Sequence, residues 1–217
     1  EVLIVVMNLG HGNGIVNGAD AVLLSSLALL GVTGRVAAEA SIAALAVVLV
    51  CRKDKMRRIR PGYLAGMGVE SLIYAVLFGA VVARLVVLFL PGFVLGLETG
   101  GLNAAGVGLQ FVMCMGAGVF EELLFRVLIM GGLTWAGMRW FKMKRGGALF
   151  LGALVSSLLF SAFHYIGSFA YGFTVASFAY RFFAGMLLAF IYRTRGFGIA
   201  ATTHALYDVL VTLQGLV

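Results

Sequence analysis

Two adjacent carboxylates, Glu121 and Glu122, lie in a long apolar stretch, and Arg126 follows four residues after the second. Ionisable side chains are costly inside apolar segments, so each is a candidate functional group. Glu122 and Arg126 share one face of a helix and can pair. Glu121 points about 100° away, so the same arginine does not neutralise it, and it can act as a base toward water. A structural ion pair at a helix end is the alternative interpretation.

Two histidine motifs follow in later apolar stretches. Phe160 and His164 share a helical face, and His204 and Asp208 are spaced so that the carboxylate can accept a bond from the imidazole. Taken singly, these residues fit an interfacial histidine and a buried structural His–Asp pair. Together, two imidazoles and two carboxylates can activate a water molecule and polarise an amide carbonyl.

The composition indicates the elements that must position these residues. The chain has 217 residues, of which 62% are hydrophobic and 12% charged, and its mean hydropathy is +1.05. Soluble domains carry about twice that share of charge, so the outer surface here is itself apolar. We therefore expect an all-α fold, a polytopic transmembrane bundle of about six to eight helices with the active site inside it. We expect residues 1–217 to form a single integral membrane domain, with the motif-bearing core at about 103–216.

The apolar runs give a map of the expected spans. Asn103–Trp140 is too long for one upright crossing and predicts a tilted or broken helix, or one crossing with an interfacial segment. Residues 1–34 predict a broken span or a re-entrant segment. GxxxG spacings at Gly14/Gly18, Gly62/Gly66 and Gly92/Gly96 are compatible with helix contacts. The remaining expected spans are Val36–Cys51, Met67–Leu90, Gly147–His164, Tyr171–Tyr192 and Gly196–Leu216.

The net charge of +7 lies in loops between the apolar runs rather than in a nucleic-acid-binding stripe. The map places the three basic clusters on one face, as expected for cytoplasmic loops. We therefore expect no nucleic-acid partner. The clusters are Arg52, Lys53, Lys55, Arg57, Arg58 and Arg60, then Arg139, Lys142, Lys144 and Arg145, then Arg193 and Arg195.

The three motifs, in this order, resemble the signature of the CPBP family of intramembrane proteases. That family includes the type II CAAX prenyl endopeptidases and many bacterial proteins linked to bacteriocin maturation or immunity. Its signature is EExxxR, then FxxxH, then HxxxN or HxxxD, and the resemblance covers about Phe120–Asp208.

The resemblance implies an intramembrane endopeptidase that cleaves a membrane-associated protein or peptide. Glu121 would activate the water, His164 would help to hold it, and His204 with Asp208 would stabilise the oxyanion. Prenyl-protease members typically have asparagine at the position of Asp208. An amide donates a hydrogen bond whereas an ionised carboxylate only accepts, so Asp208 must orient His204, carry a proton or bind a metal. The supporting residues would be Glu122, Arg126 and Phe160.

The residue types leave metal use open. If zinc is bound, its ligands would be Glu121, His164 and His204, with an open position for the attacking water. The HExxH spacing of soluble zinc proteases is absent, and the resemblance favours a metal-free, glutamate-based mechanism without a cofactor.

Two other functions fit the same residues. One is a non-catalytic immunity or partner-binding membrane protein of the same fold. The other is a proton-coupled transporter, because Glu, His and Asp also form proton relays, although the sequence shows no internal repeat. For the endopeptidase, the expected partners are a membrane-associated substrate and the lipid bilayer. We expect a multi-pass protein of the plasma membrane of a prokaryote.

Overall fold

Every secondary-structure element that the computed structural model describes is a helix. The structure describes residues 61–91, 107–165 and 173–214, and the expected segments 1–34 and Val36–Cys51 lie outside them. The elements are α4 (Pro61–Phe89), α5 (Val107–Glu122), the π-helix η2 (Leu123–Met130), α6 (Gly131–Arg139), α7 (Arg145–Phe163), α8 (Val175–Arg195) and α9 (Phe197–Gln214). The all-α prediction is confirmed for this part of the chain, while the number of six to eight helices stays a prediction.

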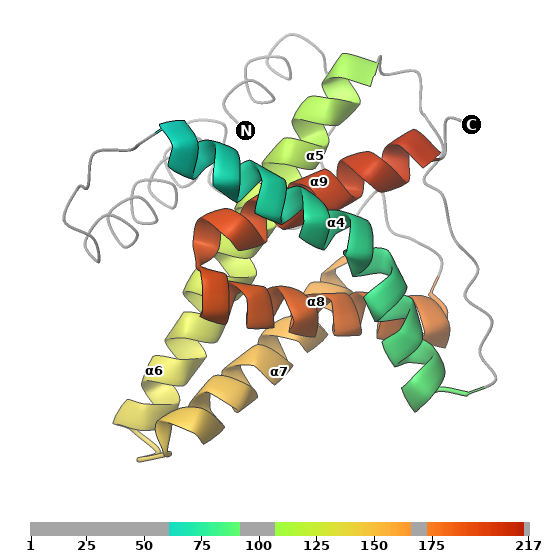
Figure 1. Cartoon of the computed structure of the whole chain (residues 1–217). Coiled ribbons are helices and arrows are strands. Elements are labelled where there is room, and N and C mark those ends of the chain that lie inside the picture. The colour runs from blue at the N-terminus through green and yellow to red at the C-terminus, as the bar shows by residue number, and fades with distance from the viewer. Residues whose placement is uncertain (1–60, 92–106, 166–172, 215–217) are drawn as a thin grey trace, which may run out of the picture.

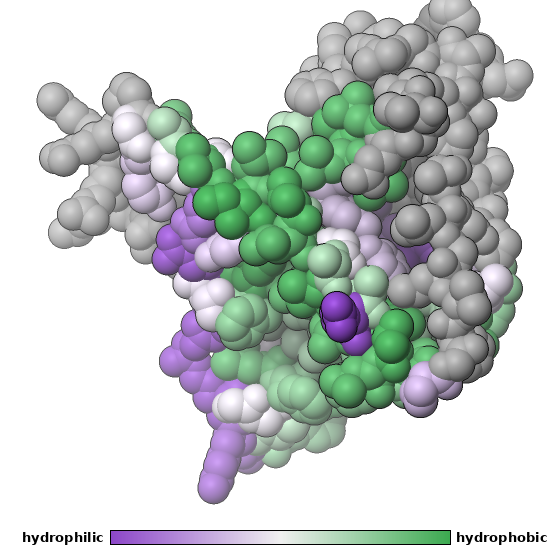
Figure 2. Space-filling view, turned by 45° about the vertical axis from the view of Figure 1, so that its right-hand side comes forward, coloured by the Kyte–Doolittle hydropathy of each residue, from purple (hydrophilic) through white to green (hydrophobic). Residues whose placement is uncertain are grey.

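Three of these helices are long and apolar enough to cross a membrane: Gly62–Phe89, Arg145–Phe163 and Val175–Arg195. They correspond to three of the expected spans, and α9 is a shorter apolar helix at the position of the fourth. Many of their large apolar side chains face outward, and Figure 2 shows a broad hydrophobic face with most hydrophilic residues along its left-hand edge and one isolated hydrophilic group near its centre. An apolar outer surface is what a bilayer requires.

In the segment predicted as tilted or broken, residues 107–139 form one continuous helical rod (Figure 1) in which the helix type changes. α5 passes directly into the π-helix η2, which passes into α6. Two hydroxyl groups bond to carbonyl oxygens of η2: Ser156 Oγ donates to Phe125 O at 2.6 Å, and Thr134 Oγ1 donates to Met130 O at 2.7 Å. Short π-helical segments are rare and frequently occur at functional sites.

Packing between distant helices sets the rest of the arrangement. α9 lies against both α5 and α4, and α7 lies against α8 (Figure 1). Gly196, with φ +90°, is the single residue between α8 and α9, and this left-handed conformation favours glycine. The main hydrophobic core joins α4, α8 and α9 and comprises Phe78, Val82, Ala184, Leu188, Ile191, Ile199 and Ala200.

Candidate active site

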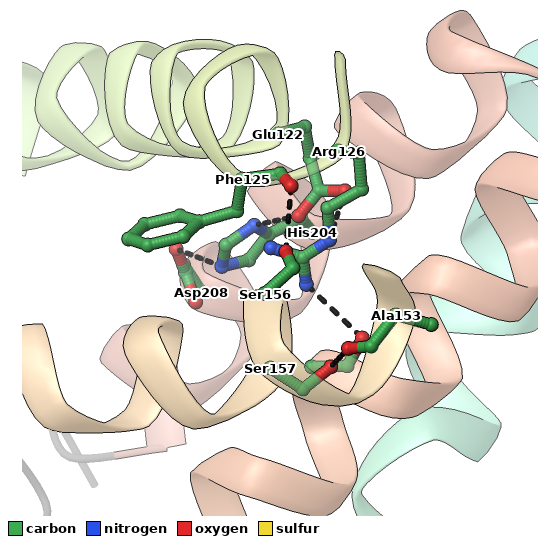
Figure 3. A network of polar contacts seen from close by, with 9 residues as sticks. Glu122, Phe125, Arg126, Ala153, Ser156, Ser157, His204 and Asp208 are labelled. Carbon is green, nitrogen blue, oxygen red and sulfur yellow. Dashed lines mark hydrogen bonds and ion pairs between the residues drawn. The ribbon is translucent and has the colours of Figure 1, made fainter. Parts of the chain in front are cut away.

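The three motifs come from separate elements and meet where α5, η2, α7 and α9 pack together. Figure 3 shows Glu122 and Arg126 of the first motif beside His204 and Asp208 of the third. Glu121 and Glu122 are the last two residues of α5, and Arg126 lies in the first turn of η2. Phe160 and His164 lie at the carboxyl end of α7, and His204 and Asp208 lie in the middle of α9.

Glu122 connects two of the motifs. Its Oε1 lies 3.0 Å from Nδ1 of His204, which donates a hydrogen bond to it. Its Oε2 lies 3.0 Å from Nε of Arg126, and both side chains are fully buried. This second contact is an ion pair without hydrogen-bond alignment. The predicted pairing of Glu122 with Arg126 is therefore present, and the bond to His204 is an addition that sequence spacing did not indicate.

Arg126 is held by groups other than its carboxylate partner. Its Nη2 donates to the carbonyl oxygen of Gly185 in α8 at 3.3 Å. Its guanidinium carbon lies 4.7 Å from the centroid of the Phe160 ring, a cation–π distance. A flat aromatic surface suits the planar guanidinium, which explains why a phenylalanine here supports the site.

The Phe160 ring also contacts both imidazoles. Its centroid lies 4.9 Å from that of His164 and 5.7 Å from that of His204, both with edge-to-face geometry. The ring is buried, with 3% of its surface exposed. Phe160 therefore lies in contact with the arginine of the first motif, the histidine of its own motif and the histidine of the third.

The two imidazoles are oriented by different acceptors. His164 Nδ1 lies 2.8 Å from the carbonyl oxygen of Phe160, which can only accept, so a neutral ring carries its lone pair on Nε2. His204 was expected to donate to Asp208. The structure corrects this, because Nε2 lies 3.7 Å from Asp208 Oδ2, too far for a hydrogen bond. The orienting bond goes to Glu122 because α5 packs directly on α9 beside Nδ1.

Glu121 is buried beside this network but is not bonded into it. Its exposed fraction is 6%, and the charged groups acting on its carboxyl include His204, Asp208 and Arg126. Within residues 61–91, 107–165 and 173–214, no hydrogen bond or ion pair involves Glu121. The two adjacent carboxylates thus differ as expected, since one is paired and the other is not.

The candidate metal ligands do not lie together in the described part of the chain. Among the described residues, no three His, Cys, Asp or Glu side chains are grouped so that they could hold a metal ion. The alternative set of Glu121, His164 and His204 does not form such a group, and His204 Nδ1 is bonded to Glu122.

Three small residues that sequence reasoning did not single out hold the site in place. Ser156 bonds to the π-helix, and Gly185 accepts from Arg126 while packing against Ser157. Gly118 packs on the backbone of Ala205, next to His204. The only signal for Ser156 was a hydroxyl in an apolar span. The two glycines were hidden among 30 in the chain.

Gly118 gives a test of this packing. A Cβ built there would lie 2.7 Å from Ala205 N and 2.8 Å from its Cα, and backbone atoms cannot move aside cheaply. We expect Gly118→Ala to force α5 and α9 apart and to lower the free energy of unfolding by about 1–3 kcal/mol, the usual cost of overpacking. Thermal unfolding of the purified protein measures the change.

Gly132→Ala is the matched control. Gly132 is also a helical glycine, but no atom of the described residues lies within 4 Å of its added Cβ. Alanine favours helices over glycine, so this variant should unfold at or above the wild-type temperature. Equal stability of the Gly118 and Gly132 variants would contradict the close α5–α9 contact.

Comparison with known proteins identifies the family of the chain. A family model described as Type II CAAX prenyl endopeptidase Rce1-like matches residues 102–210, half of the chain. No curated protein and no solved structure matches it. The matched residues contain all three motifs and most of the described helices. Together with the three apolar helices, the match identifies an integral membrane protein. The chain belongs to the Rce1-like family of type II CAAX prenyl endopeptidases.

Proposed function

We propose that the chain is an intramembrane endopeptidase that hydrolyses a peptide bond of a membrane-associated protein or peptide, with Glu121 as the general base. The observation that carries the proposal is the contrast between the two carboxylates. Glu122 is occupied by His204 and Arg126, whereas Glu121 is buried next to the same imidazole without a bonded partner among the described residues. A carboxylate without a bonded partner, beside an imidazole, is suited to taking a proton from water.

The proposed reaction begins at a water molecule between Glu121 and His164. The carboxylate of Glu121 takes one proton, while Nε2 of His164 accepts a hydrogen bond from the water and orients it. The hydroxide attacks the carbonyl carbon, and the carbonyl oxygen becomes an oxyanion. Glu121 then delivers its proton to the nitrogen of the leaving peptide as the C–N bond breaks. The products are a carboxylic acid and an amine, so the atoms and charges balance.

In this proposal His204 stabilises the oxyanion. An imidazolium has an N–H at both nitrogens, so it can donate to Glu122 through Nδ1 and to the oxyanion through Nε2. Glu122, Arg126 and Phe160 act through this ring by fixing its position. They are positioning residues rather than groups that touch the substrate.

The decisive experiment compares peptide termini in membrane fractions from cells that produce wild-type or Glu121→Gln protein. We expect at least one new terminus on a membrane protein that appears only with the wild type. Identical termini in both fractions would favour a non-catalytic partner-binding protein. A proton flux that depends on Glu121, without any cleavage, would favour a transporter.

Asp208→Asn tests how the third motif works. Because Glu122 already orients His204, we propose that Asp208 carries a proton and donates to the oxyanion. We therefore expect the amide, which also donates, to keep activity within about tenfold of wild type. Asp208→Ala cannot donate and should lose most of the activity. Turnover of the peptide found in the proteomic comparison measures both. A loss of about 10⁴-fold in Asp208→Asn, as when a triad carboxylate is replaced, would instead assign Asp208 the orienting role.

Metal dependence is tested on the purified protein. We expect activity to survive exhaustive chelation and the zinc content to be substoichiometric, because the candidate ligands do not form a metal-holding group. Elemental analysis and turnover before and after chelation give the answer. One zinc per chain, with activity lost on removal and recovered on re-addition, would contradict the metal-free mechanism.

We also propose that residues 1–217 form one multi-pass domain and that the protein lies in the plasma membrane of a prokaryote. The bacterial members of the family that the motifs resemble support the second point. The exposed apolar surface of the described helices supports the first.

A further inference from the structure

The turn between α6 and α7 carries the densest positive charge of the described residues. Residues 139–145 read Arg-Trp-Phe-Lys-Met-Lys-Arg, which gives four positive charges in seven positions, and all four basic side chains are exposed. The sequence contains no aspartate or glutamate between Glu122 and Asp208. None of the ion pairs among the described residues involves these four side chains.

Large aromatic side chains accompany the charges. Trp135, Trp140 and Phe141 have exposed fractions of 56%, 66% and 76%, and the two indole rings lie edge-to-face at 5.3 Å. Tryptophan is enriched where membrane proteins cross from hydrocarbon to headgroups, because its ring is apolar and its N–H is polar. We call these seven residues the basic–aromatic turn: Trp135, Arg139, Trp140, Phe141, Lys142, Lys144 and Arg145.

The position of the turn at the start of α7 sets its depth in the membrane. The apolar helix α7, long enough to cross the membrane, begins at Arg145, so the residues just before it lie where the chain leaves the bilayer. The turn also has a defined shape. The backbone N–H of Met143 donates to Gly137 O at 3.0 Å, and the Met143 sulfur packs 3.3 Å from the position of a Cβ on Gly137. The charges are therefore presented on a fixed scaffold at headgroup depth.

We propose that the basic–aromatic turn binds the headgroups of anionic phospholipids in the leaflet where α7 enters the bilayer. Phosphate oxygens of the headgroups accept from Arg139, Lys142, Lys144 and Arg145, while the aromatic rings pack among the upper acyl segments. A lipid fits better than a nucleic acid, because the exposed tryptophans lie next to a membrane-crossing helix rather than on a polar face. This inference does not depend on the proposed catalytic residues.

The chain provides its own probe for the test. It contains two tryptophans, and both lie in the basic–aromatic turn, so intrinsic tryptophan fluorescence reports on this surface alone. The full chain is reconstituted into vesicles in which either the phosphatidylcholine or the phosphatidylglycerol carries bromine on its acyl chains, which quenches nearby tryptophan. We expect brominated phosphatidylglycerol to quench at least about threefold more effectively at equal mole fraction, and added salt to reduce this preference.

Charge removal tests the assignment. The combined variant Lys142→Gln, Lys144→Gln and Arg145→Gln keeps both tryptophans and should quench equally with the two lipids. Arg193→Gln removes an exposed charge at the end of α8 and should keep the wild-type preference. Equal quenching of the wild type by both lipids, or no quenching by either, would overturn the proposal.

Two further fluorescence measurements distinguish the lipid headgroup from other anionic ligands. Inorganic phosphate added to zwitterionic vesicles should leave the emission unchanged, because an isolated ion is not held at headgroup depth. A single-stranded oligonucleotide should also have no effect. A shift of the emission with the oligonucleotide, without a preference for anionic lipid, would reject the lipid in favour of a nucleic-acid surface. Retention of the lipid preference by the triple variant would show that other residues bind it.

Discussion

Replacing Glu121 by glutamine is expected to lower the turnover number by at least about 10³-fold while leaving the protein folded. A general base contributes about 10²–10⁴-fold, and this residue both activates the water and returns the proton to the leaving nitrogen. Glutamine has nearly the same shape but cannot take a proton from water. No bond among the described residues is lost, because Glu121 makes none there. Turnover in vesicles and the unfolding temperature are measured on the same preparation.

Two comparisons make this result specific. Glu121→Asp keeps the base but withdraws it by one methylene, so we expect intermediate activity. Glu70→Gln removes a carboxylate of the exposed pair with Arg195 and should leave turnover unchanged. Wild-type turnover in Glu121→Gln would exclude Glu121 as the base and would turn attention to Asp208, the other carboxylate beside His204.

The local part of the site could be predicted from spacing, because it depends on one helix at a time. Glu122 and Arg126 pair as their four-residue separation indicated, even though the backbone between them has become π-helical. The four-residue spacing of His204 and Asp208 was a less reliable guide to which group their side chains bond. A four-residue separation brings the groups within 3.7 Å, but the direction of the imidazole is set by a carboxylate on another helix.

What could not be predicted is how the helices dock. The bond from His204 to Glu122 joins residues 82 positions apart and exists because Gly118 lets α5 approach Ala205. GxxxG spacing pointed instead to Gly62 and Gly66, and an added Cβ at either meets no atom of the described residues within 4 Å. A glycine is needed where two backbones touch, and that depends on the tertiary arrangement rather than on a repeat.

Where the structure describes them, the expected spans are helical and three are long and apolar enough to cross a membrane, but their ends were shifted. α4 begins at Pro61 rather than Met67, because Gly62, Tyr63, Leu64 and their neighbours continue the helix before the most apolar part. α8 begins at Val175 rather than Tyr171, because Thr174 caps it by accepting from Ser177 N at 3.0 Å. Hydropathy locates a membrane-crossing run, whereas capping groups fix where its helix starts and stops.

Glu122→Gln is expected to destabilise the protein severely, lowering the free energy of unfolding by about 3 kcal/mol or more. Glu122 and Arg126 are both fully buried, so loss of the carboxylate leaves the guanidinium charge inside the protein without its paired anion. Glu70→Gln is the matched control, because its pair with Arg195 is exposed and should change stability by no more than about 1 kcal/mol. Unfolding in the same lipid or detergent measures both variants.

The double variant Glu122→Gln with Arg126→Gln separates stability from positioning. With both charges removed, the buried guanidinium charge is gone together with its paired carboxylate, so much of the lost stability should return. Turnover should stay at least about tenfold below wild type, because His204 Nδ1 has lost the carboxylate that orients it and supports its positive charge. Recovery of both properties would mean that Glu122 serves only to neutralise Arg126. Similar stability of Glu122→Gln and Glu70→Gln would mean that the Glu122–Arg126 pair is not the buried contact described here. Recovered folding with impaired turnover is the outcome expected of a carboxylate that holds the arginine of its own helical segment and the histidine of another helix.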